Sequence, residues 1–165
     1  MRKILYWGLV PVFSMLLGGC GGNTFLMKES AYVVPAPPNT DEMLIYVFRE
    51  DSSFGGARKF SIIADDTIMA VLTPGTFSYF KMPAGEYEIV AYMSPSPIMH
   101  YRVLAAPGKT VYLYCKMGFT SGIYMEVLDE ARARQFMGEF KFTEIELKGQ
   151  KAKMDYKTYY NNLYK

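Results

Sequence analysis

The sequence predicts an all-β protein: an antiparallel β-sandwich with one short C-terminal helix. From residue 43 onward, short runs of apolar, β-branched and aromatic residues alternate with Gly, Pro and Asp, a pattern typical of sandwiches and barrels. Half of the 165 residues are hydrophobic, and 14 are Tyr and 11 are Phe. A chain of this length and composition can bury a substantial core.

The first 20 residues have the three parts of an export signal. Arg2 and Lys3 precede an apolar run at 4–17, and small residues then lead to Cys20. The apolar run is interrupted by Gly and Pro and is shorter than the roughly 20 residues that a spanning helix needs. A retained transmembrane anchor is therefore the weaker alternative.

The ending Leu17-Gly18-Gly19-Cys20 resembles the bacterial lipobox. The resemblance implies that residues 1–19 are removed as a signal peptide and that Cys20 is the lipidation site, carrying acyl chains such as palmitate. Gly21 follows the cysteine, where Asp would resemble an inner-membrane retention signal. The implied location is therefore the bacterial cell envelope, with an outer-membrane lipid anchor facing the periplasm. The alternative is an ordinary secretory signal with an unrelated cysteine.

The composition without the signal excludes several classes of protein. Of the 18 Lys and Arg, two are Arg2 and Lys3, so the remaining 16 equal the 16 Asp and Glu. A neutral chain gives no electrostatic reason to expect nucleic acid as a partner. Besides Cys20 only Cys115 is present, and the sole histidine is His100. No intramolecular disulfide and no zinc site of Cys and His ligands is therefore expected.

Composition shifts divide the chain into four parts. Residues 1–19 are the signal peptide, 20–41 the lipidated cysteine and a flexible Pro-rich tether, 42–147 the β-sandwich domain, and 148–165 a basic Tyr-rich tail. A strand docked on the domain at 31–34 is the alternative to a free tether there.

The expected strands follow from the apolar runs between turn residues. Asp65-Asp66 is expected to form a tight hairpin turn. Alternation in the strand through Cys115 places Val111, Leu113, Cys115 and Met117 in the core, and Tyr112, Tyr114 and Lys116 on the other face. The expected strand ranges are 43–49, 59–64, 67–72, 76–82, 86–93, 98–104, 110–117 and 123–128.

The rest of the domain is expected to hold two similar turns, one helix and a last strand. Pro83-Ala84-Gly85 and Pro107-Gly108 each launch a strand, with Gly supplying a positive φ. Residues 129–137 are expected to be helical, with Asp129 as N-cap, and to close an edge or end of the sandwich. Residues 140–147 are expected to form a last strand, with a break in phase near Thr143.

The stretch from Leu44 to about Phe142 resembles an uncharacterised domain family of bacterial lipoproteins, similar in style to PEGA-type sandwiches. The family usually has Asp-Gly at the hairpin, where this chain has Asp66-Thr67. The resemblance implies a fold and no chemical activity. The motifs that carry it are Leu44-Ile45-Tyr46-Val47-Phe48-Arg49, Asp65-Asp66, Pro74-Gly75-Thr76, Met82-Pro83-Ala84-Gly85-Glu86-Tyr87 and Pro107-Gly108-Lys109-Thr110-Val111-Tyr112.

No residue pattern indicates catalysis, so no catalytic residue, metal or cofactor is expected. His100 lies in an expected strand, and no Gly-x-Ser-x-Gly elbow accompanies it. The Asp65-Asp66 pair is too small for a calcium site, which needs six to eight oxygen ligands. Cys115 is expected to be a small buried hydrophobe.

Tyrosine is the unusual residue, because its rigid ring and polar tip suit both protein interfaces and sugar stacking. The sequence favours a non-enzymatic structural or accessory module that binds an envelope protein. A glycan- or peptidoglycan-binding module is the alternative, and an enzyme is less favoured. In the simplest interpretation, the tyrosines only pack against residues of neighbouring strands. The candidate binding surface comprises Tyr112, Tyr114, Tyr156, Tyr159 and Tyr160.

The tail carries five lysines and one acid, Asp155. Its composition fits a solvated end, or an element that recognises anionic lipid headgroups or an acidic protein surface.

Overall fold

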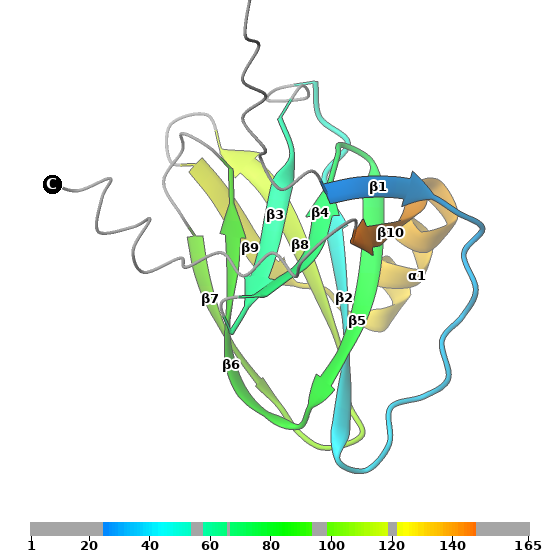
Figure 1. Ribbon diagram of the computed structural model, residues 1–165, viewed down its shortest axis with the longest axis vertical. Coiled ribbons are helices and arrows are strands. Elements are labelled where there is room, and N and C mark those ends of the chain that lie inside the picture. The colour runs from blue at the N-terminus through cyan, green and yellow to red at the C-terminus, as the bar shows by residue number, and fades with distance from the viewer. Residues whose placement is uncertain (1–24, 54–57, 66, 94–98, 119–121, 148–165) are drawn as a thin grey trace, which may run out of the picture.

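The computed structural model describes residues 25–53, 58–65, 67–93, 99–118 and 122–147, which form two packed β-sheets and one helix (Figure 1). This confirms the predicted all-β sandwich with a short helix. The elements in chain order are β1 (Phe25–Glu29), β2 (Glu42–Arg49), β3 (Phe60–Ala64), β4 (Thr67–Leu72), β5 (Thr76–Pro83), β6 (Gly85–Tyr92), β7 (Met99–Ala105), β8 (Thr110–Gly118), β9 (Gly122–Val127), α1 (Glu130–Glu139) and β10 (Lys141–Leu147).

The strands form a six-stranded sheet in the order β1-β10-β5-β2-β8-β9 and a four-stranded sheet in the order β4-β3-β6-β7. Most neighbouring strands are antiparallel, as expected, but β2 runs parallel to β8, and β10 runs parallel to β5. Parallel neighbours need a crossover connection. For β2 and β8, the chain between them supplies it, because it passes through the whole four-stranded sheet.

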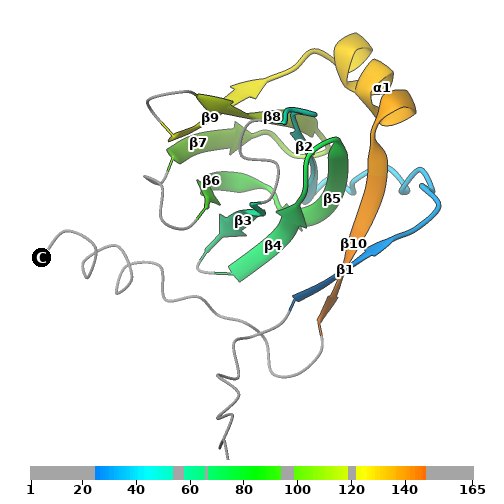
Figure 2. The ribbon, with the colours of Figure 1, turned by 90° about the horizontal axis from the view of Figure 1, so that it is seen from above.

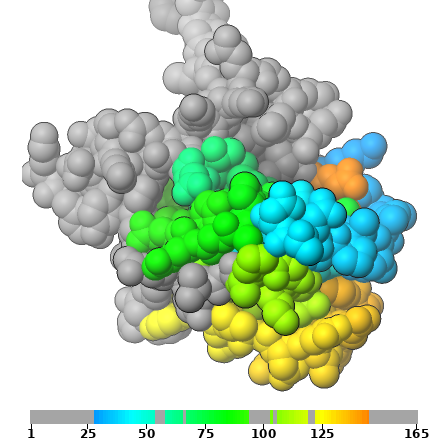
Figure 3. Space-filling view, turned by 90° about the horizontal axis from the view of Figure 1, so that it is seen from below, coloured from blue at the N-terminus to red at the C-terminus, as the bar shows by residue number. Residues whose placement is uncertain are grey.

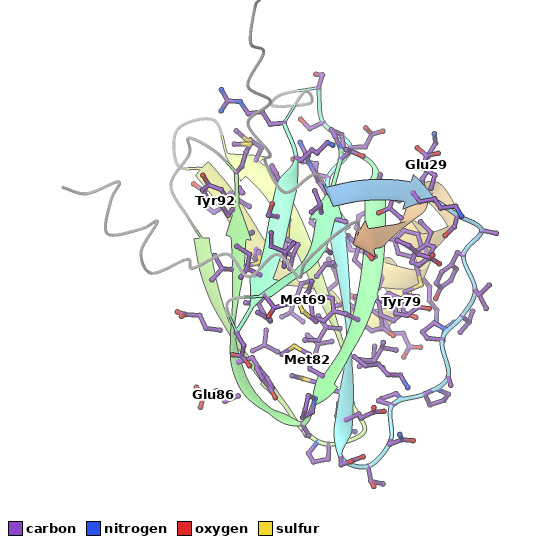
Figure 4. The ribbon with its side chains drawn as sticks, viewed as in Figure 1. Glu29, Met69, Tyr79, Met82, Glu86 and Tyr92 are labelled. Atoms are coloured by element: carbon purple, nitrogen blue, oxygen red, sulfur yellow. The ribbon has the colours of Figure 1, made fainter. Side chains whose placement is uncertain are left out.

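The core between the sheets is built from alternate residues of the facing strands. Met43, Ile45 and Val47 of β2 point into it, together with Leu113 and Cys115 of β8. All five are fully buried. Figure 4 shows Met82 of β5 on this inner side and Tyr79 of the same strand on the other. The predicted facing of Leu113 and Cys115 is confirmed.

The outer face of the six-stranded sheet carries a second apolar cluster beneath α1. Leu44, Tyr46 and Phe48 of β2 are buried there, alongside Phe77 and Tyr114. Helix α1 was expected to close an edge or end of the sandwich, but it covers this face instead (Figure 2). Both faces of β2 are therefore buried, one in the core between the sheets and the other beneath α1. This accounts for the uninterrupted apolar run at 43–48.

Helix α1 begins where the sequence predicts. The side chain of Asp129 accepts a hydrogen bond from the backbone N–H of Arg132 at 2.8 Å, so Asp129 is the N-cap. Arg132 and Arg134 are exposed, and Ala133 is buried against the sheet. Within the described ranges, no helix is long and apolar enough to cross a bilayer.

The segment expected to be a tether contributes to the packed domain. Residues Phe25–Glu29 form β1, which pairs with β10 at the far end of the chain. Tyr32 then packs edge-on against Phe77, with ring centroids 5.1 Å apart. The packed domain therefore extends at least to Phe25, well before the expected boundary at 42. The alternative of a docked strand at 31–34 is also not observed, since the strand lies earlier.

With one exception, the described turns have the conformation that the sequence predicts. Asp65 lies in a two-residue β3–β4 hairpin with a φ of 47°, while Asp66 lies outside the described residues. Gly108 has the expected positive φ of 71°, but Gly85 does not and is already the first residue of β6. Both Pro-containing turns carry the chain from one sheet to the other.

Candidate functional site

A groove of about 670 Å³ lies between α1 and the segment that precedes β2. The helix forms one wall, the Pro-rich segment forms the other, and β2 and β8 form the floor. Figure 3 shows the segment before β2 in blue and cyan, the β7–β8 turn in yellow-green and the α1 region in yellow and orange on one side of the molecule. The lining residues are Tyr32, Val34, Pro35, Pro37, Pro38, Leu44, Tyr46, Gly108, Lys109, Thr110, Tyr112, Glu130, Arg134, Met137 and Gly138.

Two tyrosines on neighbouring parallel strands form the floor of the groove. Tyr46 and Tyr112 are register partners on β2 and β8, and their rings stack with centroids 5.4 Å apart at 27°. Their position follows from alternation, because their neighbours Ile45 and Leu113 occupy the inner core. The floor thus combines apolar ring surface with hydroxyl groups.

Tyr32 ties the Pro-rich wall to the floor and to the helix. Its hydroxyl lies 2.8 Å from that of Tyr46, and it donates to Sδ of Met137 at 3.7 Å. One side chain therefore links the segment before β2, strand β2 and α1. This places the wall formed by 34–38 opposite the helix.

Burial changes the titration of the two floor tyrosines, Tyr46 and Tyr112. Burial, reinforced by the hydrogen bond with Tyr32, raises the pKa of Tyr46 well above its usual value. Burial likewise raises the pKa of Tyr112. Both phenols are protonated near neutral pH, as an ordinary tyrosine is, and the raised pKa values extend this state to more alkaline pH.

The helix wall carries one ion pair. Arg134 contacts Glu130 at 2.6 Å from Nη2 and 2.9 Å from Nε. The Glu130 carboxylate raises the pKa of Arg134. Since both side chains are largely exposed, this pair contributes little to stability but fixes the polar rim of the wall.

Of the residues predicted to form a binding surface, Tyr112 and Tyr114 lie in different environments. Tyr112 lines the groove, whereas Tyr114 is 7% exposed and lies under the helix, stacked on Phe136 at 4.9 Å. Tyr114 is therefore not a surface residue, which corrects that expectation. Cys20, Tyr156, Tyr159 and Tyr160 lie outside the described residues. Tyr32, Tyr46 and the prolines of the wall were not anticipated.

A buried cation lies at the end of β2, whereas Gly108 of the groove lies beside the start of this strand. Arg49 is 2% exposed, and its guanidinium sits 3.9 Å from the centre of the Phe60 ring. Its Nη1 donates to the carbonyl oxygens of Leu72, at 2.8 Å, and of Arg58. Burial lowers the pKa of Arg49 to about 10. These contacts join β2 to the four-stranded sheet, which indicates a structural role.

Cys115 is the register partner of Arg49 and is fully buried. Burial raises the pKa of its thiol to about 12, although the nearby Arg49 acts in the opposite direction. A protonated, inaccessible thiol is a poor nucleophile. Cys115 thus packs as a small hydrophobe, as expected.

His100 lies in β7 as the register partner of Val90, in the four-stranded sheet. In the described part of the chain, no three His, Cys, Asp or Glu side chains come together as a metal site would require.

The chain matches no protein family model, no curated protein and no solved structure. The resemblance to a lipoprotein domain family therefore stays an expectation from the sequence.

Proposed function

We propose that this chain is a lipid-anchored envelope protein that binds an extended segment of another envelope protein in the groove. The observation that carries the binding proposal is the groove itself: a tyrosine floor beside an exposed apolar wall. The proposed anchor rests on the lipobox-like ending at Cys20. The proposed location is the outer membrane, with the domain facing the periplasm.

The composition of the wall favours a protein partner over other ligands. Val34 is 74% exposed at its rim, and Pro35, Pro37 and Pro38 continue the apolar surface. Such side chains, next to Tyr46 and Tyr112, match the aromatic-rich grooves that hold extended peptides. The wall gains rigidity from its prolines, so little conformational freedom is lost on binding.

The tyrosine floor keeps glycan as a second candidate. The half-buried ring of Tyr112, which packs on the buried ring of Tyr46, offers an apolar surface with a hydroxyl group, which suits contact with a sugar ring. In this case the described apolar wall would remain largely uncovered, which makes glycan the less favoured ligand.

Site-specific photocrosslinking in intact cells tests the groove. A photoreactive residue at Val34 is expected to form an adduct with a discrete envelope protein, whereas the same residue at exposed Thr67 on β4 is not. Gly138→Trp should abolish the adduct by filling the groove. A Cβ at Gly138 meets nothing within 4 Å, so a side chain can start there without a clash at its first atom.

The matched control is Ala131→Trp, an exposed position on the same helix that does not line the groove. Adducts that persist in the Gly138→Trp variant contradict binding in the groove. Sedimentation with purified peptidoglycan, lost in Tyr112→Ala and retained in Tyr124→Ala on β9, would instead establish the glycan function.

The anchor is tested by replacing the proposed lipidation site. Cys20→Ala is expected to block incorporation of labelled fatty acid and to leave the unprocessed precursor, seen as slower migration on a gel. Cys115→Ala is the control and should be lipidated and processed normally, because Cys115 lies in the core. Normal processing and membrane association of Cys20→Ala would exclude a lipoprotein.

A further inference from the structure

The floor of the groove offers a bound peptide almost no strand edge to pair with. Along the groove, β2 is hydrogen-bonded on one side to β5 and on the other to β8 (Figure 1). Strand β8 pairs with β9 from Leu113 onward, and just before it Tyr112 accepts a hydrogen bond from the backbone N–H of Leu128. An added strand needs a free row of backbone groups. The floor therefore presents side chains rather than backbone to a ligand.

Neither wall supplies such a row. Pro35, Pro37 and Pro38 have no N–H group, and the carbonyl of Pro37 already accepts from Nζ of Lys81 at 3.4 Å. Helix α1 uses its backbone groups within its own turns, except at its ends. A bound segment must therefore leave most of its backbone in water. This is the property of a polyproline II helix, which has no internal hydrogen bonds and a solvated backbone.

The free polar groups of the groove are chiefly donors. The hydroxyl of Tyr112 and the ammonium of Lys109 make no hydrogen bond or ion pair with any residue that the structure describes. The carboxylate of Glu130, by contrast, already accepts two hydrogen bonds from Arg134. A proline-rich segment is the complement, because each proline keeps its carbonyl acceptor and lacks the N–H donor.

The charge of the groove adds a second requirement. Its charged lining residues are Lys109, Arg134 and Glu130, and the last two form an ion pair at 2.6 Å. The net positive charge therefore lies at Lys109, which is exposed. Glu42, at the same end of the groove, pairs with Lys81 at 3.5 Å. An acidic side chain on the ligand would complement Lys109.

We infer that the groove recognises a proline-rich segment in the polyproline II conformation, with an acidic residue beside Lys109. The inference deepens the proposed function and rests on it for the role of the groove as a peptide site. The ring of Tyr112 and the apolar wall at Val34 and Pro35 receive the prolines, while the Tyr112 hydroxyl donates to a carbonyl of the segment. An amphipathic helix also needs no backbone partner, but its carbonyls are already bonded, so the donors of the groove would meet no acceptor.

Selection of displayed random peptides on the purified protein tests the inference apart from the natural partner. The enriched peptides are expected to hold closely spaced prolines and an Asp or Glu. Gly138→Trp should remove this enrichment, and Ala131→Trp should keep it. Enrichment of proline-free peptides, or none that depends on the groove, would overturn the inference. If proline-rich peptides bind but Val34 yields no adduct in cells, the proposed envelope partner is wrong and the preference of the groove stands.

The affinity of one enriched acidic peptide, measured by fluorescence anisotropy, tests the two polar contacts. Lys109→Glu should weaken binding at least about tenfold, because it brings like charges together. Lys59→Glu is the control, since Lys59 is exposed and does not line the groove. Tyr112→Phe keeps the ring and removes the hydroxyl, so it should weaken binding about fivefold through one lost hydrogen bond. An unchanged affinity in either Lys109→Glu or Tyr112→Phe would contradict the inferred contacts.

Discussion

Replacing Leu113 by alanine is expected to lower the free energy of unfolding by about 2–5 kcal/mol. Leu113 is fully buried between the two sheets, on the central part of β8, where its neighbours Val47 and Cys115 are also inaccessible. The change removes apolar contacts and leaves a cavity that strands fixed on both sides cannot collapse to fill. Urea denaturation followed by circular dichroism measures the difference.

Two further variants complete the test, the first as a control for burial on the same face and the second to show which face is which. Val127 is the register partner of Leu113 on β9 but is 53% exposed, so Val127→Ala should change stability by no more than about 0.5 kcal/mol. Tyr112→Ala should cost less than Leu113→Ala, since Tyr112 lies half-buried on the groove floor. A greater loss at Tyr112 than at Leu113 would mean that the two faces of the six-stranded sheet are reversed.

The strands were predictable because their ends carry strong local signals. Prolines, glycines and the Asp65-Asp66 pair interrupt the apolar runs, and each expected strand falls within a residue or two of the observed one. Even the phase break near Thr143 has a structural cause. At that residue β10 ends its pairing with β5 and begins to pair with β1.

The predictions that were wrong concern contacts between segments that are far apart in the sequence. Strand β1 has no strong pattern of its own, and its partner β10 lies more than 110 residues later, so no local signal reveals the pairing. Tyr114 was placed on a surface because alternation cannot show that Phe136 of α1 covers it. One unused signal was present: the unbroken apolar run at 43–48 indicates a strand covered on both faces.

The groove could likewise be predicted only in part, because local sequence patterns do not reveal contacts between distant segments. Alternation alone places Tyr112 opposite the core, and this much could be predicted. That Tyr32 reaches Tyr46 and Met137, and so holds the Pro-rich segment opposite α1, depends on contacts across 14 and 105 residues of sequence. The candidate site therefore became visible only with the fold.

Replacing Phe136 by alanine is expected to cost about 3 kcal/mol, the lower end of the range for buried aromatic residues, because Phe136 is only partly buried. Its ring stacks on Tyr114 at 4.9 Å and on Phe140 at 5.0 Å, and lies 6.2 Å from Phe48. It is thus one of the contacts that hold α1 on the sheet, together with those of Ala133 and Met137. Exposed Gln135 on the same helix provides the control, and Gln135→Ala should cost no more than about 0.5 kcal/mol.

The consequence for function is separable from the loss of stability. Without Phe136 the helix wall of the groove loses its support, so the Val34 photocrosslink should weaken at temperatures where the sandwich itself stays folded. Hydrogen exchange should show α1 and β10 losing protection, while β3 and β6, in the other sheet, keep theirs. If all strands lose protection together, the outer cluster and the inner core form one cooperative unit. The helix then does not unfold separately from the sandwich, which contradicts the prediction.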